Sequence, residues 1–165
     1  MDLPNSSVLN LWNRFTRQHG QYKNSSIPNH FYFCDNEHDA NTCAELVAKN
    51  IKQATAPSIW WYEYHNEPMP KVGTLFIVTD WHGEAKAIIE VTKLEQIRFK
   101  DVGKAFAYAE GEGDRSLAYW RKVHRAYYTR EMKKAGAHKL GVLFSSMLDF
   151  YLPHLQHRQM LLQHL

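Results

Sequence analysis

Lys52, Thr55 and Glu90 have side chains of the types that a general acid–base site would use. Lys52 and Thr55 are three positions apart, so on a helical path they share one face. A lysine drawn into a dry cleft has a lowered pKa and acts as a base or an electrostatic clamp, with a hydroxyl as its partner. Such a lysine needs a carboxylate nearby. Glu90 is the candidate, because it interrupts the apolar stretch AIIEV, where an unpaired buried charge is costly.

Each of these residues also has an ordinary structural interpretation. A lysine at the C-terminus of a helix usually complements the helix dipole and faces solvent. Alternation with Ile89 and Val91 is compatible with an outward-facing Glu90 on a strand. The sequence leaves both alternatives open.

An acidic turn with two glycines, EGEGDRS at 110–116, precedes the most basic part of the chain. Gly113 permits a sharp turn, and we expect Asp114 to cap the following helix by accepting from the amides of residues 116 and 117. The turn is a poor phosphate cradle, because Glu110, Glu112 and Asp114 repel an anion unless a cation intervenes. The role of Glu112 stays open.

The segment 115–134 carries seven lysines and arginines against one acid, in a chain whose net charge is only +3. A local cationic face of this kind suits a polyanion such as nucleic acid. A solvated helix surface explains the same charges equally well. The basic residues are Arg115, Arg121, Lys122, Arg125, Arg130, Lys133 and Lys134.

Aromatic residues crowd the segment 58–64. On the strand that we predict there, Trp60 and Tyr62 fall on one face and Trp61 on the other. Flat rings beside a cationic helix predict a platform on which the bases of single-stranded RNA stack. At least one of the two faces must instead belong to the core, and we expect Trp61 to be the more buried tryptophan.

Hydrophobic patterns predict the elements that must position these residues. Their order predicts an α+β fold, in which a mixed or antiparallel sheet curls into a small β-barrel with flanking helices. We expect one domain over 1–165, with an N-terminal helical extension and loop at 1–29 and a C-terminal tail at 154–165. The predicted helices are 7–19, 39–53, 102–109 and 115–134; the predicted strands are 30–34, 58–64, 74–80, 86–92, 94–99, 142–145 and 147–152, with a hairpin at His82-Gly83.

Composition excludes several classes of protein. A hydrophobic content of 44% with 22% charged residues argues against disorder. No apolar run reaches the ~18 residues of a membrane span, and no secretion signal is evident, so we expect a cytoplasmic protein without a membrane partner. Cys34 and Cys43 form no Cys-x-x-Cys pair and are expected to be reduced thiols. The histidines lack the spacing of zinc ligands, so we expect no metal site from them.

Three stretches of the chain together resemble the ASCH domain family, whose fold is related to the PUA domain. The resemblance implies a PUA-like barrel whose cleft receives RNA or a nucleobase. Some members are amidohydrolases that act on N4-acetylcytidine, and others are metal-dependent ribonucleases that cleave single-stranded RNA. The stretches are KQATAPSIWWYEY (52–64), PKVGTLFIVTDWHGEAKAIIEVT (70–92) and FKDVGKAFAYAEGEGDRSLAYWRKVHRAYY (99–128), the last with the motif EGEGD-x-S-x3-WR of one branch.

The same resemblance suggests roles for individual residues. In the amidohydrolases a lysine, a threonine three residues later and a strand glutamate form the catalytic set, which Lys52, Thr55 and Glu90 match. The loop Glu112–Ser116 looks like the opposite wall of the cleft. A ribonuclease would recruit Mg²⁺ or Mn²⁺ through this acidic loop, whereas a non-catalytic module would bind RNA or a nucleoside ligand in the same cleft. With the aromatic and basic residues, the expected substrate-binding set is Trp60, Tyr62, Glu112, Asp114, Ser116, Arg121 and Arg125.

Overall fold

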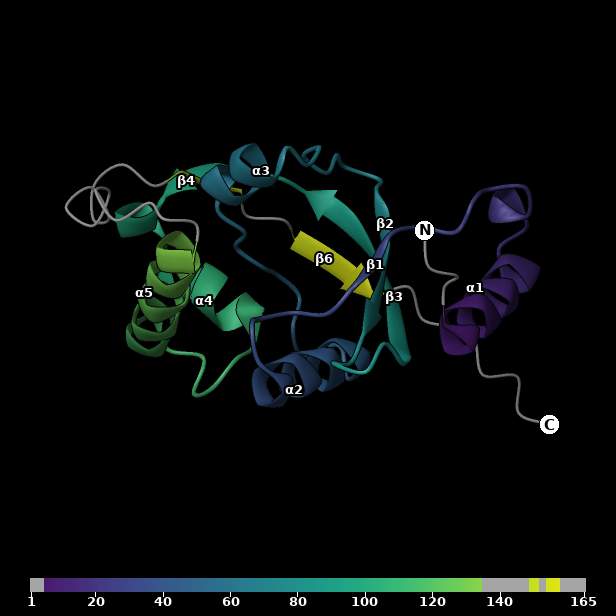
Figure 1. The fold of residues 1–165 in the computed structure, drawn as a ribbon, viewed down its shortest axis with the longest axis horizontal. Coiled ribbons are helices and arrows are strands. Elements are labelled where there is room, and N and C mark those ends of the chain that lie inside the picture. The colour runs from purple at the N-terminus through teal and green to yellow at the C-terminus, as the bar shows by residue number, and fades with distance from the viewer. Residues whose placement is uncertain (1–4, 135–148, 152–153, 158–165) are drawn as a thin grey trace. The chain divides into compact units, whose positions relative to one another are not determined.

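The computed structural model describes residues 5–134, 149–151 and 154–157, which belong to two compact units (Figure 1). The first unit combines Met1–Asn50, Leu75–Glu90 and Gln156–Leu165. The second unit combines Ile51–Thr74 and Val91–Leu155.

Two helices build much of the first unit. Helix α1 spans Ser6–Gln18, and the side chain of Asn5 caps it by accepting from the amide of Ser7 at 3.0 Å. The 3₁₀ helix η1 (Gly20–Tyr22) follows, and helix α2 spans Glu37–Ala48 with Asn36 as its cap. The buried stripe of α1 is the one that its helical periodicity predicts: Val8, Leu11, Trp12 and Phe15.

A mixed sheet runs in the order β1-β2-β3-β6. Strands β1 and β2 are parallel, whereas β2 and β3 are antiparallel with Ile77 opposite Ile88. The predicted mixed sheet is thus confirmed. The predicted barrel is wrong, because the sheet formed by the described strands is open. The strand bounds are β1 His30–Phe31, β2 Leu75–Thr79, β3 Ala85–Lys93 and β6 His154–His157.

The strands β2 and β3 bury consecutive residues, so both of their faces are covered. Ile77 and Ile88 pack with the apolar stripe of α1 in one core cluster. Val78 and Ala87 point to the opposite face by alternation, and α2 contacts β2.

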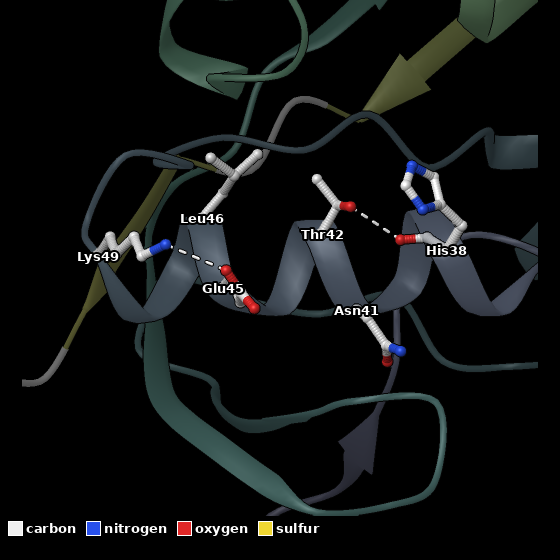
Figure 2. Close-up of a pocket in the computed structure, with 6 residues that line it drawn as sticks. All are labelled: His38, Asn41, Thr42, Glu45, Leu46 and Lys49. Carbon is white, nitrogen blue, oxygen red and sulfur yellow. Dashed lines mark hydrogen bonds and ion pairs between the residues drawn. The ribbon is translucent and has the colours of Figure 1, made fainter.

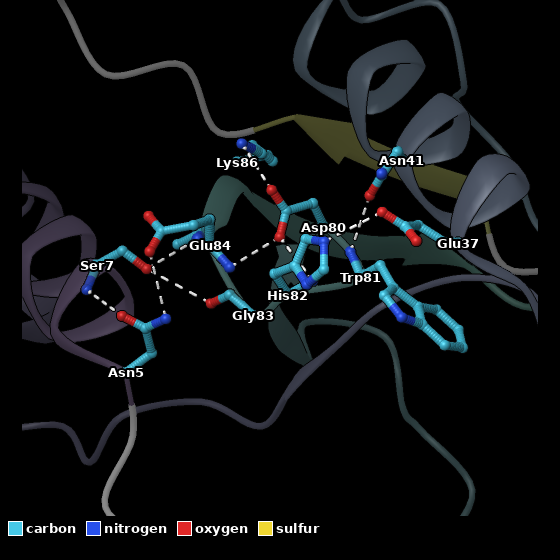
Figure 3. A network of polar contacts seen from close by, with 11 residues as sticks. Asn5, Ser7, Glu37, Asn41, Asp80, Trp81, His82, Gly83, Glu84 and Lys86 are labelled. Atoms are coloured by element: carbon cyan, nitrogen blue, oxygen red, sulfur yellow. Dashed lines mark hydrogen bonds and ion pairs between the residues drawn. The ribbon is translucent and has the colours of Figure 1, made fainter.

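The β2–β3 hairpin turns at the predicted dipeptide His82-Gly83 (Figure 3). Asp80 organises the turn: its Oδ1 accepts from the amides of His82 at 3.0 Å and Glu84 at 2.9 Å, and its Oδ2 pairs with Lys86 at 2.9 Å. Gly83 has a φ of +85°, a left-handed conformation that glycine adopts without strain. These contacts stabilise the turn, and this structural role explains why the polar side chains gather there.

The second unit packs its helices around one aromatic core. Phe99, Phe106, Trp120 and Tyr128 meet there, with Trp120 5.2 Å from Phe99 between ring centroids. Burying such rings supplies most of the apolar area that holds a small unit together. Its elements are α3 Ile59–His65, β4 Gln96–Arg98, the 3₁₀ helix η2 Phe99–Asp101, α4 Lys104–Glu110, α5 Leu117–Lys134 and β5 Asp149–Tyr151, with β4 and β5 antiparallel.

The strand predicted over 58–64 is wrong, since this segment forms helix α3. Ser58 caps the helix by accepting from the amide of Trp61 at 3.1 Å, and Asn66 ends it in the left-handed conformation. Trp60 stacks on Tyr64, four residues later, with ring centroids 5.1 Å apart. Local capping and this i,i+4 stacking outweigh the strand preference of aromatic residues.

Strand β6 was not predicted, since it begins the segment 154–165 that was expected to be a tail. The other differences are mainly of length. Helix α2 ends at Ala48, before the predicted end at residue 53, and the strand predicted over 94–99 shrinks to β4. Of the strand predicted over 147–152 the described part is β5, and the strand predicted over 142–145 lies outside the described residues. Among the described helices, none is both long enough and apolar enough to cross a membrane.

Candidate functional site

The side chain of Lys52 is buried inside the second unit, with only 3% of the residue exposed. Its ammonium Nζ lies 3.2 Å from Oε2 of Glu110 and 2.5 Å from Oε1 of Glu112. Lys52 belongs to no helix, so the alternative of a solvated lysine complementing a helix dipole is wrong. The amide of the next residue, Gln53, donates to the carbonyl of Ala109 at 2.8 Å and so ties the Lys52 segment to α4.

Glu110 is the innermost acid of this group, with only 1% of its surface exposed. Burial alone would raise the pKa of its carboxyl group. The charges of Lys52 and then of His124, whose Nε2 lies 3.4 Å from Oε2, outweigh burial and hold the pKa below the ordinary 4.5. Glu110 is therefore an ionised carboxylate inside the unit, and its two cationic neighbours make that possible.

His124 completes the group on α5. Its ring lies on that of Trp120 at 4.2 Å between centroids, and its Nδ1 is 3.0 Å from the carbonyl of Trp120. Burial opposes the charged form, but Glu110 raises the pKa of His124 above its ordinary value. With an acceptor beside each ring nitrogen, the imidazolium form donates from both. Two carboxylates then balance two cations in what we call the Lys52 cluster: Lys52, Glu110, Glu112 and His124.

Two buried polar atoms of the cluster region lack a hydrogen bond: Oε1 of Glu110 and the indole Nε1 of Trp120. The indole N–H is close enough to the carboxylate to help lower its pKa, although it does not reach hydrogen-bond geometry. Buried polar groups are nearly always satisfied in folded proteins, and exceptions concentrate at functional positions. Oε1 of Glu110 is thus an acceptor without a hydrogen bond, in a carboxylate whose Oε2 lies near Lys52 and His124.

The glycines of the acidic turn are needed by its backbone. Gly111 has a φ of +76°, and a Cβ there would lie 2.6 Å from the carbonyl oxygen of Ile51. Gly113 has a φ of +54°, and a Cβ there would collide with the ring of Tyr119. Close approach of Gly111 to the Lys52 segment is what brings Glu110 and Glu112 to either side of the ammonium group.

The prediction that Asp114 caps α5 needs correction. Its Oδ1 accepts from the amide of Ser116 at 2.8 Å, as expected, but the cap of the helix is Ser116, whose Oγ accepts from the amide of Tyr119 at 3.0 Å. The hydroxyl and amide of Ser116 lower the pKa of the exposed Asp114. Asp114 and Ser116 therefore act together in the turn.

Thr55 and Glu90, the expected companions of Lys52, fall in different units. Thr55 is half-buried in the second unit, on a segment that is not helical, so the helical face that it was predicted to share with Lys52 does not exist. Glu90 is half-buried in the first unit, opposite Leu75 in the β2–β3 register. The convergence of Lys52, Thr55 and Glu90 stays a prediction. The carboxylates that the structure places on Lys52 are Glu110 and Glu112.

The expected stacking residues lie on α3. Trp60, Trp61 and Tyr62 are all half-buried, so the expected contrast between the two tryptophans is absent. Burial, with a smaller effect from Glu67, raises the pKa of Tyr62 to about 12. The alternating faces predicted for these rings are wrong because the segment is helical.

The two arginines expected to hold phosphates are exposed on α5. Arg121 donates from Nη2 to the carbonyl of Lys100 at 3.1 Å, and the guanidinium of Arg125 lies 5.7 Å from the ring centroid of Phe99. Both contacts orient a cation at the surface without neutralising its charge.

The described residues do not fit a divalent metal. They contain no group of three or more His, Cys, Asp or Glu side chains arranged to hold one. The acidic turn, through which a ribonuclease would recruit magnesium or manganese, directs Glu110 and Glu112 to the ammonium of Lys52. We derive no step through a metal.

A shallow hollow lies along α2 in the first unit (Figure 2). Its polar groups satisfy one another along the helix: Lys49 pairs with Glu45 at 3.0 Å, and the hydroxyl of Thr42 donates to the carbonyl of His38 at 2.8 Å. These are ordinary i,i+4 contacts of a solvated helix surface, so this hollow carries no chemistry.

Sequence reasoning missed Glu110 and His124 as members of the site. The signal for Glu110 was its position on α4, because it follows the buried Phe106 and Ala107 at helical spacing. The signal for His124 was its place four residues after the buried Trp120. A charged residue on an apolar stripe needs a counter-charge, and two such residues point to each other.

Comparisons with known sequences and structures identify the same family. The sequence model of the ASCH domain matches residues 29–141. The crystal structure of an ASCH domain from Lactobacillus crispatus JV V101 is 32% identical with a TM-score of 0.78, and 92% of each chain is covered. That of protein EF3133 from Enterococcus faecalis V583, described by the family model DUF984, is 26% identical with a TM-score of 0.78, covering 92% of this chain and 87% of that one. No curated protein matches this sequence.

Members of the matching family generally bind RNA. The match spans the Lys52 segment, the β2–β3 hairpin, the acidic turn and α5. The chain belongs to the ASCH domain family.

Proposed function

We propose that this protein binds single-stranded RNA through the second unit, with its phosphates on the exposed cations of α5. The observation that carries the proposal is the inward direction of two of the three acids in the preceding turn, Glu110 and Glu112; the third, Asp114, is exposed and accepts from the amide of Ser116. Glu110 and Glu112 pair with Lys52 inside the unit, so their charges do not oppose an anion at the surface. The exposed cations, which we call the basic surface, are Arg121, Lys122, Arg125, Arg130 and Lys133.

Two other acids of the second unit are paired with a neighbouring cation, whereas Glu131 lies on α5 itself. Asp101 pairs with Arg98 at 2.7 Å, and Glu95 pairs with Lys93 at 2.8 Å. A cluster of cations with locally paired acids raises the concentration of a polyanion near the surface and steers its approach. Phosphate contacts of this type give affinity without sequence specificity.

A place for a nucleobase lies beside the N-terminus of α5. Tyr108 is 62% exposed, and the guanidinium of Arg115 lies 5.1 Å from its ring centroid. Together with Lys104 and Leu117 they line a mostly apolar hollow. Here one face of a base would stack on Tyr108 while Lys104 and Arg115 meet the adjacent phosphates. Ring and cations are already in position, so little ordering is required on binding.

The direct test is the binding of a labelled single-stranded RNA of mixed sequence, measured by fluorescence anisotropy over a series of salt concentrations. We expect the logarithm of the affinity to fall linearly with the logarithm of the salt concentration, because phosphate contacts release counterions. A duplex of the same sequence should bind more weakly, since its bases cannot stack on Tyr108. An affinity that does not change with salt would contradict the proposal.

A second candidate function is hydrolysis, which the buried ammonium of Lys52 favours. Against the effect of burial, Lys52 and His124 lower the pKa of Glu110, the partner of this ammonium group, and groups whose pKa is shifted by specific charges concentrate at active sites. As an amidohydrolase on N4-acetylcytidine, the chain would use Lys52 to stabilise developing negative charge, Thr55 for its hydroxyl and Glu90 to move protons. As a ribonuclease it would use the same lysine at the scissile phosphate. For either activity, we expect the protein to act in the cytoplasm.

Two incubations distinguish these activities from binding alone. N4-acetylcytidine is followed by the release of cytidine, and labelled single-stranded RNA is followed on a denaturing gel with and without EDTA. Once circular dichroism has shown that Lys52→Met is folded, release of cytidine that is lost in this variant supports the amidohydrolase, and RNA cleavage that is lost in it supports the ribonuclease. Both substrates remaining intact, with RNA binding retained, would leave a non-catalytic RNA-binding module.

A further inference from the structure

We propose that Cys34 and Cys43 of the first unit form a reversible intramolecular disulfide, and so are a site of oxidative modification. Their Sγ atoms lie 3.9 Å apart. They are the two cysteines of the chain, so no third thiol competes within one molecule. This inference is independent of the RNA-binding proposal, which concerns the second unit.

The geometry requires only a small movement. A disulfide joins its sulfur atoms at about 2.05 Å, so the two Sγ atoms must approach by roughly 1.9 Å. Cys34 lies in the bend between β1 and Asn36, the cap of α2, where a change of side-chain rotamer moves its sulfur without disturbing a helix or strand. Cys43 sits on the buried side of α2 and provides a fixed partner.

The backbone at Cys34 is unusual. Its φ is +65°, a left-handed conformation that residues other than glycine, asparagine and aspartate rarely adopt. Residues are held in such conformations only where their surroundings determine them, and they concentrate at functional positions. Here the conformation coincides with a thiol placed against a second thiol.

The two sulfur atoms differ in their exposure to solvent, and we assign them different roles on that basis. Cys34 is half-buried and within reach of a small oxidant, whereas Cys43 is 3% exposed. The thiolate of Cys34 attacks one sulfur of a low-molecular-weight disulfide such as glutathione disulfide and expels a glutathione thiolate. The thiolate of Cys43 then attacks the Cys34 sulfur of the mixed disulfide and expels the second glutathione. Each cysteine loses its proton to solvent, and the two electrons leave on the two glutathione molecules.

Packed thiols that merely touch are the competing interpretation, because an S–H group also donates weakly to a neighbouring sulfur. The two interpretations differ under oxidation. A resolving thiol converts the mixed disulfide into an internal one, whereas a thiol that only packs leaves the glutathione adduct in place.

The test treats the full-length protein with excess glutathione disulfide, then denatures it in the presence of N-ethylmaleimide so that every remaining thiol is labelled, and determines the intact mass. We expect a mass lower than that of the reduced protein by two hydrogen atoms, no maleimide label, and a proteolytic peptide linking Cys34 to Cys43. Dithiothreitol should restore two labelled thiols. A stable glutathione adduct at Cys34, or two thiols that remain free to react with maleimide after oxidation, would overturn the proposal.

Two variants keep the result interpretable. Cys43→Ser should accumulate one glutathione adduct at Cys34, because the resolving thiol is missing. Cys34→Ser should gain neither an adduct nor a disulfide, since the remaining thiol is buried. Equal rates of adduct formation in both variants would contradict the assigned roles, and Cys43→Ala replaces Cys43→Ser if the hydroxyl disturbs folding. Far-ultraviolet circular dichroism shows whether each variant is folded.

Discussion

Lys52 and Glu110 are fifty-eight residues apart in sequence, yet they form an ion pair of 3.2 Å in which each side chain is only 1% exposed. Desolvating two charges is expensive, and the pair is tolerated because Glu112 and His124 supply further charged neighbours. Glu110 and Glu112 of the acidic turn thereby direct their charges at a lysine inside the unit, while the exposed cations of α5 face solvent. Because these two acids are paired inside the unit, an acidic turn can lie next to a surface that we propose binds an anion.

Removing the ammonium group should destabilise the protein strongly. Lys52→Met leaves Glu110 and Glu112 with one fewer cation, and breaking a buried pair by removing one partner costs about 3–5 kcal/mol of the free energy of unfolding. Urea denaturation measures the change. Lys49→Met is the matched control: Lys49 pairs with Glu45 at 3.0 Å on the exposed surface, so its loss should cost less than about 1 kcal/mol. Equal effects of the two substitutions would contradict a buried Lys52.

Stability should decrease on the acid side because of Glu110. Its pKa is lowered in the folded protein, so the stabilisation that it contributes is complete above the ordinary 4.5 and is lost as the pH falls through the folded value. We expect the unfolding free energy to decline below about pH 4.5. Glu110→Gln should flatten that decline, which urea titrations at several pH values would reveal.

On the alkaline side, His124 should limit stability. Its pKa is raised in the folded protein, so its contribution is complete below the ordinary 6.5 and disappears as the pH rises through the folded value. Nuclear magnetic resonance of the His124 ring protons should show a pKa above 6.5, and His124→Gln should abolish the alkaline decline. A titration midpoint below 6.5 would mean that burial outweighs Glu110.

The sequence predicted the first unit better than the site. The α1 stripe follows from helical periodicity, and the β2–β3 pair follows from two apolar runs on either side of the His82-Gly83 turn. The aromatic segment 58–64 was wrongly predicted to be a strand. Its aromatic residues favour strands, but the Ser58 cap and the stacking of Trp60 on Tyr64 stabilise a helix instead. Hydrophobic periodicity also cannot show which buried charged side chains form an ion pair with each other.

Lys52 illustrates that last difficulty. Its spacing to Thr55 suggested a helix, and the carboxylate sought for it was Glu90, on a predicted strand. Its observed partners are instead Glu110 and Glu112, which reach it because the backbone of Gly111 passes close to Ile51. A contact between segments so far apart in sequence depends on tertiary packing, which local patterns do not encode.

Gly111 should therefore be intolerant of a side chain. Gly111→Ala combines a positive φ with a Cβ that would lie 2.6 Å from the backbone of Ile51, so we expect a loss of at least about 2 kcal/mol. Gly20→Ala is the control, because no atom lies within 4 Å of a Cβ at that position. Comparable stability of the two variants in urea would contradict the close approach.

Base stacking should depend on Tyr108. Tyr108→Ala removes an exposed ring, so the fold should keep its stability while the affinity for single-stranded RNA falls by about 1–3 kcal/mol. Tyr108→Phe retains the ring and should bind nearly as well as the wild type. Anisotropy titrations at one salt concentration make the comparison, and an unchanged affinity in Tyr108→Ala would remove the hollow from the proposed binding surface.

The measurement that tests the central claim most directly compares the salt dependence of RNA binding by the wild-type protein, by Arg121→Ala/Arg125→Ala and by Lys49→Ala. If the basic surface of α5 holds phosphates, the double variant should bind more weakly, and the slope of its logarithmic salt plot should be smaller by up to about two. Lys49→Ala should match the wild type. Identical affinities and slopes for all three proteins would show that α5 holds no phosphate and would contradict the account.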